Sequence, residues 1–353
     1  MKINYKYIIC ACVVVLLLTV GRISTQRPNK KWGIDKHEPL ECVIALKGHS
    51  TRDVKFSTGL HYEFLTKSQN ILGHEVFIRL ADTSENVIDS LKYGRIDLAV
   101  IPARDSAGIA EYEGLHCSKM FPDSTLWVSG ENGSLEGHRL GLLTMRLFAM
   151  DDFERTVKRF SPDYEPLSRA RRGYKYQDAS PYDDLFKEFA KPLGWDWRLL
   201  AAIVWQESRF RIEARSSRGA EGLMQVMPAT ASRFNAQDEL LDPVRNLESG
   251  TGYLKRLKKM FAEDAESEEE LTRITLAAYN AGEGRLKELI LYAGAMELPN
   301  KKWSDLEAVI PHLRGGDVML ADSVKISAFM GYETIKYVSM IDSLYRAFCV
   351  IAP

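Results

Sequence analysis

A glutamate at the end of an apolar helical segment is the residue in this sequence whose type and position best suit catalysis. Leu200, Ile203 and Val204 recur at helical spacing, and Glu207 continues the same stripe. Burial of a carboxyl group on such a stripe raises its pKa toward the range in which it can donate a proton. The sequence therefore predicts a general acid at Glu207. The competing interpretation from periodicity alone is a solvent-facing glutamate at a helix end.

A turn and a methionine-containing segment follow this acid closely in the chain. Residues 216–222 form a turn rich in small residues, in which Gly222 lets the backbone approach a ligand closely. The segment GLMQVMPAT then predicts a helix that begins with Met224 and Gln225 and is broken by Pro228. By itself this segment is weak evidence for a site, because a methionine in such a position usually belongs to the core.

Two later segments carry further polar candidates. The segment ITLAAYNAGEGRL predicts a buried helix that contains Tyr279 and Asn280 and ends at the two glycines that follow. The segment GYETIKYV places Glu333 and Tyr337 four residues apart on one helix face. Each of these patterns alone is most often a packing feature.

In combination the motifs are specific. Residues 180–348 closely resemble the lytic transglycosylases of the goose-lysozyme-like superfamily (the SLT domain), with ES, GLMQxMP, AYNAG and ETxxYV in that order. Family members that join this domain to a solute-binding-like domain are the membrane-bound lytic murein transglycosylases of the F type. The text SPYDDLF followed by GWDWRLLAAIVWQESRF resembles that branch in particular.

The resemblance implies cleavage of the β-1,4 bond between N-acetylmuramic acid and N-acetylglucosamine in peptidoglycan. Glu207 would protonate the leaving oxygen and then act as base toward the muramic acid 6-hydroxyl, which closes a 1,6-anhydro ring. No cofactor and no metal ion is implied. The resemblance also assigns contacts with the glycan strand to Ser216 (or the adjacent Ser217), Met224, Gln225, Tyr279, Asn280, Glu333 and Tyr337.

Two other functions remain open at this point. The same fold could support a lysozyme-type hydrolase, in which water replaces the 6-hydroxyl group, or a non-catalytic protein that binds or senses the cell wall. Most glycosidases use two carboxylates. Here Glu213 and Glu221 follow the predicted acid, but both lie in a polar turn, and we interpret them as surface groups.

The N-terminal half predicts a second, α/β domain. Strands and helices alternate in the order β-α-β-α-β, which favours a parallel sheet with right-handed crossovers. Residues 126–129 could add another strand. The predicted strands span residues 42–46, 76–80 and 97–101, and the predicted helices span residues 60–72 and 86–93.

This domain resembles one lobe of the fold of periplasmic solute-binding proteins. The text SENVIDSLKYGRIDLAVIPAR is similar to their segment in which a helix leads into an Asp-Leu-Ala strand. Residues 133–169 leave little room for the second lobe of that fold. The resemblance implies a small ligand or a muropeptide as partner, with a scaffold or docking role as the alternative. Arg79 and Arg104 are candidate anion contacts, although solvated arginines are the interpretation we favour.

The predicted organisation is an α/β domain and a mainly α, lysozyme-like domain. We place the α/β domain at residues 39–150, a connector at 151–179 and the SLT domain at 180–353. The connector contains the basic, tyrosine-bearing run 168–176, which could touch an anionic polymer such as cell wall but is more simply a solvated linker. Ser180 is expected to cap the first helix of the SLT domain.

Composition argues against several other classes of protein. The formal net charge of −1 does not suit a dedicated nucleic-acid-binding protein. The sequence has no glycine fingerprint for dinucleotides, no Walker loop and no zinc-ligand spacing. At 353 residues the chain is long enough for two or three domains, each with a core of its own.

The N-terminus resembles a targeting segment. Residues 1–21 contain two lysines followed by about 14 apolar residues, which suits a signal peptide and is short for a bilayer span. An uncleaved N-terminal anchor is the close alternative, and residues 22–38 read as a polar linker. Either interpretation predicts an exported protein of the periplasm that is associated with the cell envelope.

Outside the targeting segment the sequence contains three cysteines, Cys42, Cys117 and Cys349. A bridge between the first two would fit an exported protein, but small buried thiols are the interpretation we favour.

Overall fold

The chain forms two compact units in the computed structural model. One consists of Met1–Ser50 and Leu65–Met150, and the other of Thr51–Phe64 and Asp151–Pro353. The predicted targeting segment and linker, residues 1–38, lie outside the described residues. Within the described part of the chain, no helix is both long and apolar enough to cross a membrane. The described residues are 39–46, 58–81, 85–109, 112–131, 135, 137–161, 164–176, 178–321 and 324–353.

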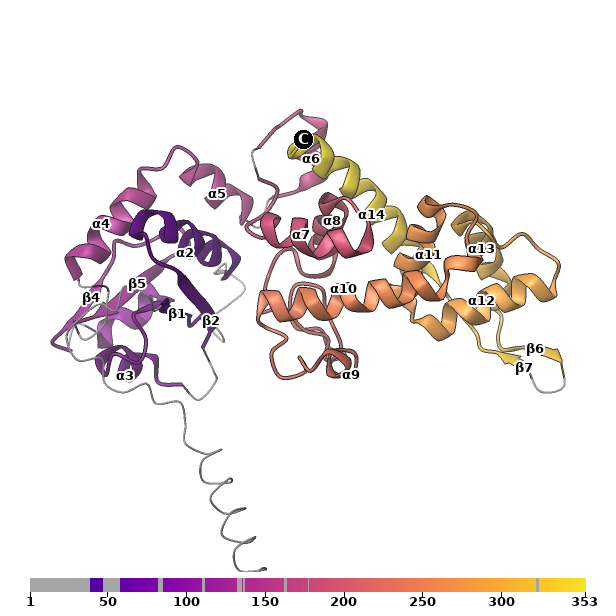
Figure 1. Ribbon diagram of the computed structural model, residues 1–353, viewed down its shortest axis with the longest axis horizontal. Coiled ribbons are helices and arrows are strands. Elements are labelled where there is room, and N and C mark those ends of the chain that lie inside the picture. The colour runs from indigo at the N-terminus through magenta and orange to yellow at the C-terminus, as the bar shows by residue number, and fades with distance from the viewer. Residues whose placement is uncertain are drawn as a thin grey trace, which may run out of the picture. The chain divides into compact units, whose positions relative to one another are not determined.

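The first unit is built on a mixed five-stranded sheet in the order β2-β1-β3-β5-β4 (Figure 1). Strand β1 pairs in parallel with β2 and β3, whereas β5 pairs antiparallel with both β3 and β4. The strands are β1 (Leu40–Ile44), β2 (Val76–Leu80), β3 (Leu98–Pro102), β4 (Leu115–Cys117) and β5 (Thr125–Gly130).

The predicted α/β class of this unit is confirmed. Three predicted strands form the parallel part of the sheet, and β5 occupies the position expected for an additional strand. The short strand β4 was not predicted, because three residues carry too little pattern. The helices of this unit are α3 (Val87–Lys92), α4 (Gly137–Phe148) and the part of α2 (Thr58–Leu72) that begins at Leu65.

The core of this unit follows from the apolar character of its central strands. All five residues of β3 are buried, as expected for a strand that is covered on both faces. Val43, Leu91, Ala99 and Val128 belong to the same buried cluster. Its members come from β1, α3, β3 and β5, so the cluster joins strands to the helix between them.

Arg79 is held by two acids of the same unit. Its guanidinium lies 3.0 Å from the Glu41 carboxylate and 2.7 Å from that of Glu85. These pairs raise the pKa of Arg79 and leave it engaged in the fold, which does not favour its role as an anion contact. Arg104 is more exposed and lies 3.9 Å from Asp105.

Cys42, Cys117 and Cys349 are free thiols, so the bridge between the first two is not formed. Cys42 is buried in β1, as predicted. The expectation of burial is wrong for Cys117, which is exposed at the end of β4, and only half true for Cys349. Strand β4 lies at the edge of the sheet, where a side chain can face solvent.

The second unit is mainly helical, as predicted for the C-terminal part of the chain. Helix α8 packs against α7 and α14, and α14 also contacts α6 and α11 (Figure 1). A short hairpin of β6 (Val318–Ala321) and β7 (Val324–Ile326) joins the helices. The helices are α5 (Phe153–Arg159), α6 (Pro166–Arg171), α7 (Asp183–Ala190), α8 (Trp197–Ser208), α9 (Pro228–Ala231), α10 (Pro243–Met260), α11 (Glu268–Ala281), α12 (Glu283–Ala295), α13 (Trp303–Val309) and α14 (Tyr332–Ile351).

Helix α8 has well-defined ends. The Asp196 side chain accepts a hydrogen bond from the Arg198 backbone N–H (2.9 Å), which caps the first turn. At the other end Arg209 (φ +54°) and Phe210 (φ +62°) both adopt the left-handed conformation, which is unfavourable for residues other than glycine. Phe210 is buried against the Trp205 ring, with centroids 5.3 Å apart. This packing stabilises the unusual backbone, and the helix ends at Ser208, one residue after Glu207.

The start of α7 differs from the prediction. The helix begins at Asp183, and Ser180 is not its cap. Instead the buried Asp183 carboxylate accepts hydrogen bonds from the backbone N–H groups of Ala179 and Ser180 and from the Ser180 hydroxyl (2.6–2.8 Å). The Ser180 oxygen in turn accepts from the Tyr182 N–H (3.0 Å), so this serine stabilises the turn before the helix.

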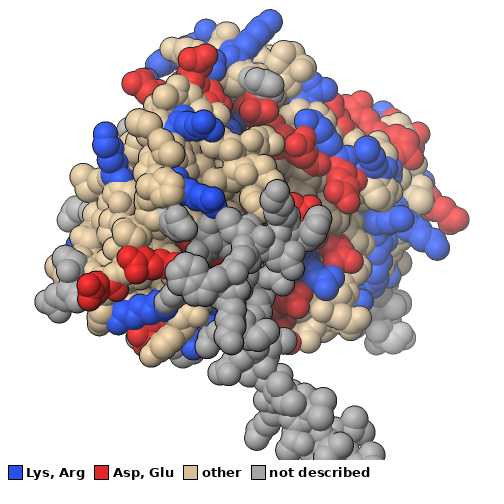
Figure 2. All heavy atoms as spheres, turned by 60° about the vertical axis from the view of Figure 1, so that its left-hand side comes forward, with Lys and Arg blue, Asp and Glu red and all other residues tan. Residues whose placement is uncertain are grey.

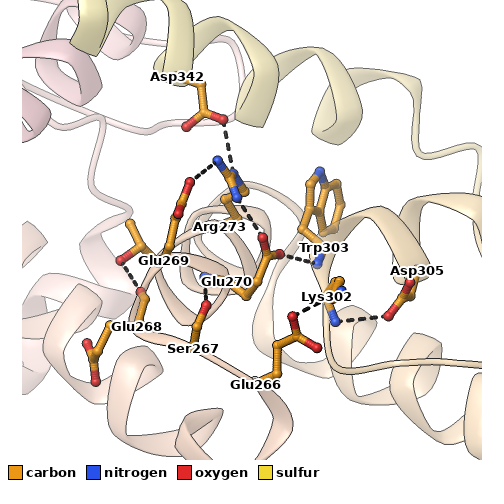
Figure 3. A network of polar contacts seen from close by, with 11 residues as sticks. Glu266, Ser267, Glu268, Glu269, Glu270, Arg273, Lys302, Trp303, Asp305 and Asp342 are labelled. Carbon is orange, nitrogen blue, oxygen red and sulfur yellow. Dashed lines mark hydrogen bonds and ion pairs between the residues drawn. The ribbon is translucent and has the colours of Figure 1, made fainter.

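A polar network joins α11 to α13 and α14 (Figure 3). Arg273 lies among three carboxylates, those of Glu269 (2.6 Å), Glu270 (2.6 Å) and Asp342 (3.1 Å). Glu270 also accepts a hydrogen bond from the backbone N–H of Trp303 (2.7 Å). Because α11 and α14 each carry predicted site residues, this network fixes the helices that position them.

Figure 2 shows one face of the molecule, on which acidic and basic side chains are interspersed among uncharged ones. This mixed surface is consistent with the formal net charge of −1.

Candidate active site

Glu207 lies in the last turn of α8 with its side chain half-buried. The Tyr337 hydroxyl, from α14, donates a hydrogen bond to Glu207 Oε1 at 2.5 Å. Helices α8 and α14 pack against each other, so two residues 130 positions apart in the sequence meet at this point.

Burial raises the pKa of Glu207 from its ordinary value of 4.5 to about 7, although the Tyr337 hydrogen bond acts in the opposite direction. Burial, together with the nearby Glu207 carboxylate, raises the pKa of Tyr279 and that of Tyr337 well above the usual value for tyrosine. Both phenols therefore remain protonated near neutral pH. The arrangement is a carboxyl group that is poised to give and take a proton, beside two neutral hydroxyl groups.

Met224 is placed by its backbone. The Tyr279 hydroxyl donates to the Met224 carbonyl oxygen (2.8 Å), and the Asn246 side-chain oxygen accepts from the Met224 N–H (2.7 Å). The Met224 side chain is fully buried and lies close to Gly250, where an added Cβ would come within 2.4 Å of the methionine sulfur. Met224 and Tyr279 are thus brought together, although they lie 55 residues apart.

The predicted helix that begins at Met224 and Gln225 is wrong. These residues lie in a turn between the bridge residues Glu221 and Val226, and Pro228 opens α9 instead of breaking a helix. Proline suits the first turn of a helix, because its missing N–H would have no helical partner there.

Gln225 adopts a left-handed backbone conformation (φ +49°). Its side-chain amide donates to the carbonyl oxygens of Ala214 (3.0 Å) and Gly222 (3.1 Å). Gln225 therefore braces the turn that follows Glu207. Gly222 (φ +77°) lies against the Asn246 side chain, to which an added Cβ would come within 2.2 Å.

Asn280 and Glu333 are exposed at the facing ends of α11 and α14. The hydroxyl of Thr334 donates to the Asn280 side-chain oxygen (2.9 Å), which joins the two helices beside Glu333. Glu333 and Tyr337 lie four residues apart on α14, as predicted, but the carboxylate is exposed and the phenol is buried. Gly284 does not end α11, because it lies within α12.

Ser216 is exposed and stabilises its own turn. Its hydroxyl accepts a hydrogen bond from the Ala220 N–H (2.9 Å). Among the described residues it makes no hydrogen bond with Glu207, so its place in the site rests on the family resemblance alone.

The two acids that follow Glu207 are engaged elsewhere. Glu221 pairs with Arg215 (3.2 Å). Glu213 is half-buried and accepts a hydrogen bond from the Thr58 hydroxyl, so its interpretation as a surface group is wrong. In the described part of the chain, no group of three or more His, Cys, Asp or Glu side chains is arranged to hold a metal ion.

Sequence reasoning missed Asn246, which supports the site from α10. This fully buried side chain accepts from Met224 and donates to the carbonyl oxygens of Glu221 (2.9 Å) and Leu240 (2.8 Å). The available signal was an asparagine on the apolar face of its helix, four residues before Gly250.

Replacing Asn246 with alanine is expected to lower the free energy of unfolding by about 3 kcal/mol, because one backbone N–H and two carbonyl groups lose their partner. Chemical denaturation of the whole chain measures this loss. Lys255→Ala, at an exposed position of the same helix, is the control and should change stability by less than about 0.5 kcal/mol. Equal stability of the two variants would contradict the role of Asn246.

Replacing Glu207 with glutamine is expected to stabilise the protein in a pH-dependent way. A folded-state pKa above the ordinary value means that ionisation is harder in the folded protein. Wild-type stability should therefore fall as the pH rises from about 4.5 to 7, by about 3 kcal/mol in total, whereas the variant escapes this loss. Melting temperatures at pH 5 and pH 8 test this expectation. The melting temperature of the variant should exceed that of wild type chiefly at pH 8, and an increase found only at pH 5 would refute the prediction.

The sequence is similar to a protein family and to several known proteins. Residues 184–300 match the family described as transglycosylase SLT domain, which confirms the resemblance deduced from the motifs. A membrane-bound lytic murein transglycosylase F from Stutzerimonas stutzeri is 40% identical over 132 residues, covering 37% of this chain and 27% of the relative. Its namesake from Hahella chejuensis is 34% identical over 164 residues, covering 46% of this chain and 31% of the relative.

These similarities involve less than a third of the curated relatives' own length. Among solved structures, an inactive mutant of the lytic transglycosylase Slt from Pseudomonas aeruginosa is 22% identical, with 61% of this chain and 30% of that chain covered at a TM-score of 0.34.

Proposed function

We propose that the protein is a peptidoglycan lytic transglycosylase in which Glu207 is the catalytic acid and base. The observation that carries the proposal is the half-buried Glu207 carboxyl, whose pKa burial raises to about 7, held by the Tyr337 hydroxyl at the end of an apolar helix. The match of residues 184–300 to the SLT domain supports the same assignment.

The proposed reaction uses one carboxyl group twice. Protonated Glu207 donates its proton to the oxygen that links N-acetylmuramic acid to N-acetylglucosamine, and the bond from the muramic acid C1 to that oxygen breaks. The resulting carboxylate takes the proton of the muramic acid 6-hydroxyl, whose oxygen bonds to C1 and closes the 1,6-anhydro ring. Glu207 returns to its protonated form, so the reaction consumes no water. A pKa near the working pH suits a group that both gives and accepts a proton.

Other residues would bind the glycan strand. Exposed Asn280 and Glu333, at the facing ends of α11 and α14, are proposed sugar contacts, as is Ser216 in the turn after α8. The remaining proposed contacts are Gln225 and Met224, which belong to the next turn, together with Tyr279 and Tyr337.

Product analysis tests the reaction. Purified peptidoglycan digested by the protein should release muropeptides with 1,6-anhydromuramic acid ends, which mass spectrometry distinguishes from hydrolysed ends by the missing water. Reducing-end muramic acid alone would instead establish the hydrolase. Binding without cleavage would establish a wall-binding or sensing protein.

We also propose that residues 39–150 form a single lobe like that of solute-binding proteins, and that the chain acts in the periplasm at the cell envelope. The mixed α/β sheet supports the first proposal, and the membrane-bound relatives support the second. We also propose that residues 151–179 form a connector and that residues 180–353 form the SLT domain. A thermal-shift measurement with muropeptides tests whether residues 39–150 bind a ligand. If the melting temperature does not change at any muropeptide concentration, the scaffold role is the remaining interpretation.

A further inference from the structure

A cavity of about 250 Å³ lies beside the catalytic helix, and the proposed reaction does not use it. Three helices line it: α6 contributes Arg171, the end of α8 contributes Trp205, Gln206 and Arg209, and α14 contributes Met340. Trp205, with Leu344 of α14, supplies an apolar wall.

The cavity carries two guanidinium groups without acidic partners among the described residues. The Arg171 side chain donates to the carbonyl oxygen of Leu167, in its own helix (3.3 Å), and Arg209 lies over the Trp205 ring at 5.4 Å from the centroid. Both arginines are exposed. Glu165 also lines the cavity, so the two positive charges exceed the negative one. Guanidinium groups bind carboxylates through paired hydrogen bonds, which makes a carboxylate the chemical group that this cavity fits best.

The backbone holds Arg209 at this place. Its left-handed conformation (φ +54°) ends α8, and the buried Phe210 that follows fixes it. A residue in this conformation is worth examining for function, since the conformation itself is unfavourable. Here it directs the chain out of the catalytic helix and places the exposed guanidinium over the Trp205 ring.

The fold also gives a role to the basic run at residues 168–176. Its first residues belong to α6, which packs against α14, and this packing brings Arg171 to the cavity. The neighbouring Arg172 is exposed and does not line the cavity. Of these two neighbouring arginines, the fold places Arg171 at the cavity and leaves Arg172 in solvent.

The cavity lies close to Glu207 but not on it. Gln206 directly precedes Glu207, and Met340 lies one helical turn after Tyr337. Successive residues of a helix project about 100° apart, so the cavity faces away from the acid around α8. The path from the acid to the cavity runs round the helix, over half the circumference of a cylinder about 10–12 Å wide, or roughly 17 Å. A peptide of about five extended residues spans that distance.

We propose that this cavity binds a free carboxylate of the peptide stem of peptidoglycan, and so distinguishes glycan strands that carry peptides from bare strands. The inference rests on the proposed function, because the stem is attached to the muramic acid whose bond Glu207 would cleave. Arg171 and Arg209 are the residues that determine this specificity.

Two forms of the substrate test the proposal: intact peptidoglycan strands, and the same strands stripped of their peptides by an amidase. Full-length wild type, Arg171→Ala, Arg209→Ala and the control Arg172→Ala are compared for binding to each form by sedimentation. The rate of release of anhydro ends gives KM and kcat. We expect each cavity variant to raise KM about tenfold on intact strands, with kcat and all values on stripped strands unchanged. Arg209→Lys, which keeps the charge, should recover part of the loss.

Equal losses on both forms of the substrate would assign a structural role to these arginines and overturn the proposal, as would unchanged binding to intact strands or an equal loss in Arg172→Ala. Failure of the proposed function gives a different result, namely no anhydro ends from wild type on either substrate. The sedimentation measurement would still decide whether the cavity recognises peptide-bearing strands.

Discussion

Glu207→Gln is expected to lower the rate of release of anhydro-muropeptides by at least about 10²- to 10⁴-fold, the usual contribution of a general acid. Glutamine has the shape of glutamate and can still accept the hydrogen bond from Tyr337, but it can neither donate a proton to the leaving oxygen nor accept one from the 6-hydroxyl. Because the same group serves both steps of the proposed reaction, neither step should remain. Mass spectrometry of digests of purified wall measures the release.

The control for this variant is Glu188→Gln, which neutralises an exposed carboxylate on α7. It should leave the rate unchanged. Wall binding by Glu207→Gln should persist, since the groups proposed to bind the strand are intact. Unchanged digestion by Glu207→Gln would show that another group supplies the proton, and the assignment of Glu207 would then be wrong.

Tyr337→Phe is expected to slow the reaction about tenfold and to move its pH dependence to higher pH. The hydroxyl stabilises the ionised form of Glu207 and thereby lowers its pKa, so its removal should raise that pKa above about 7. A hydrogen bond to a charged group contributes about 1.5–3 kcal/mol, which corresponds to about one to two pH units. Since the proposed reaction starts from protonated Glu207, the activity of wild type should decline above about pH 7 and that of the variant at higher pH.

The slower rate has a separate cause. Without the hydroxyl, the Glu207 side chain is less firmly directed at the bond to be cleaved, and positioning contributes strongly to catalysis. The pH dependence of kcat/KM between pH 5 and 9 separates the two effects. Tyr345→Phe is the matched control: the Tyr345 hydroxyl, on the same helix, lies 3.4 Å from Asp196 and away from Glu207. If the activity of Tyr337→Phe declined at a lower pH than that of wild type, or at the same pH, the hydrogen bond would not lower the pKa of Glu207.

The position of Glu207 on an apolar helix and the class of each half of the chain could be predicted from the sequence. An apolar stripe that ends in Glu207 is a local pattern, because helical periodicity relates residues three and four positions apart. The parallel strands β1 and β3 are likewise local, since each is a short apolar run between turn signals. Each motif alone is weak evidence, but their order along the chain indicated the family resemblance.

Errors arose where a segment's neighbours in space decide its conformation. The segment around Met224 and Gln225 looks helical, but Asn246 accepts the Met224 N–H and Tyr279 occupies its carbonyl oxygen, so the segment stays a turn. Ser180 looks like a helix cap, but the buried Asp183 takes its hydroxyl and N–H. Tertiary hydrogen bonds around Met224, and bonds to a buried carboxylate three residues away at Ser180, outweighed a local preference of a few tenths of a kcal/mol to about 1 kcal/mol.

The sequence by itself determined which residue could give a proton and which kind of helix would carry it. Only the tertiary structure decided the environment that makes Glu207 suitable: its half-burial, the pKa of about 7, and the Tyr337 hydroxyl that moderates it. The same packing of α6, α8 and α14 created a cavity between Arg171 and Arg209 that no local pattern indicates. The physical reason is that burial and hydrogen bonding depend on residues far apart in the chain, whereas periodicity reports only on near neighbours.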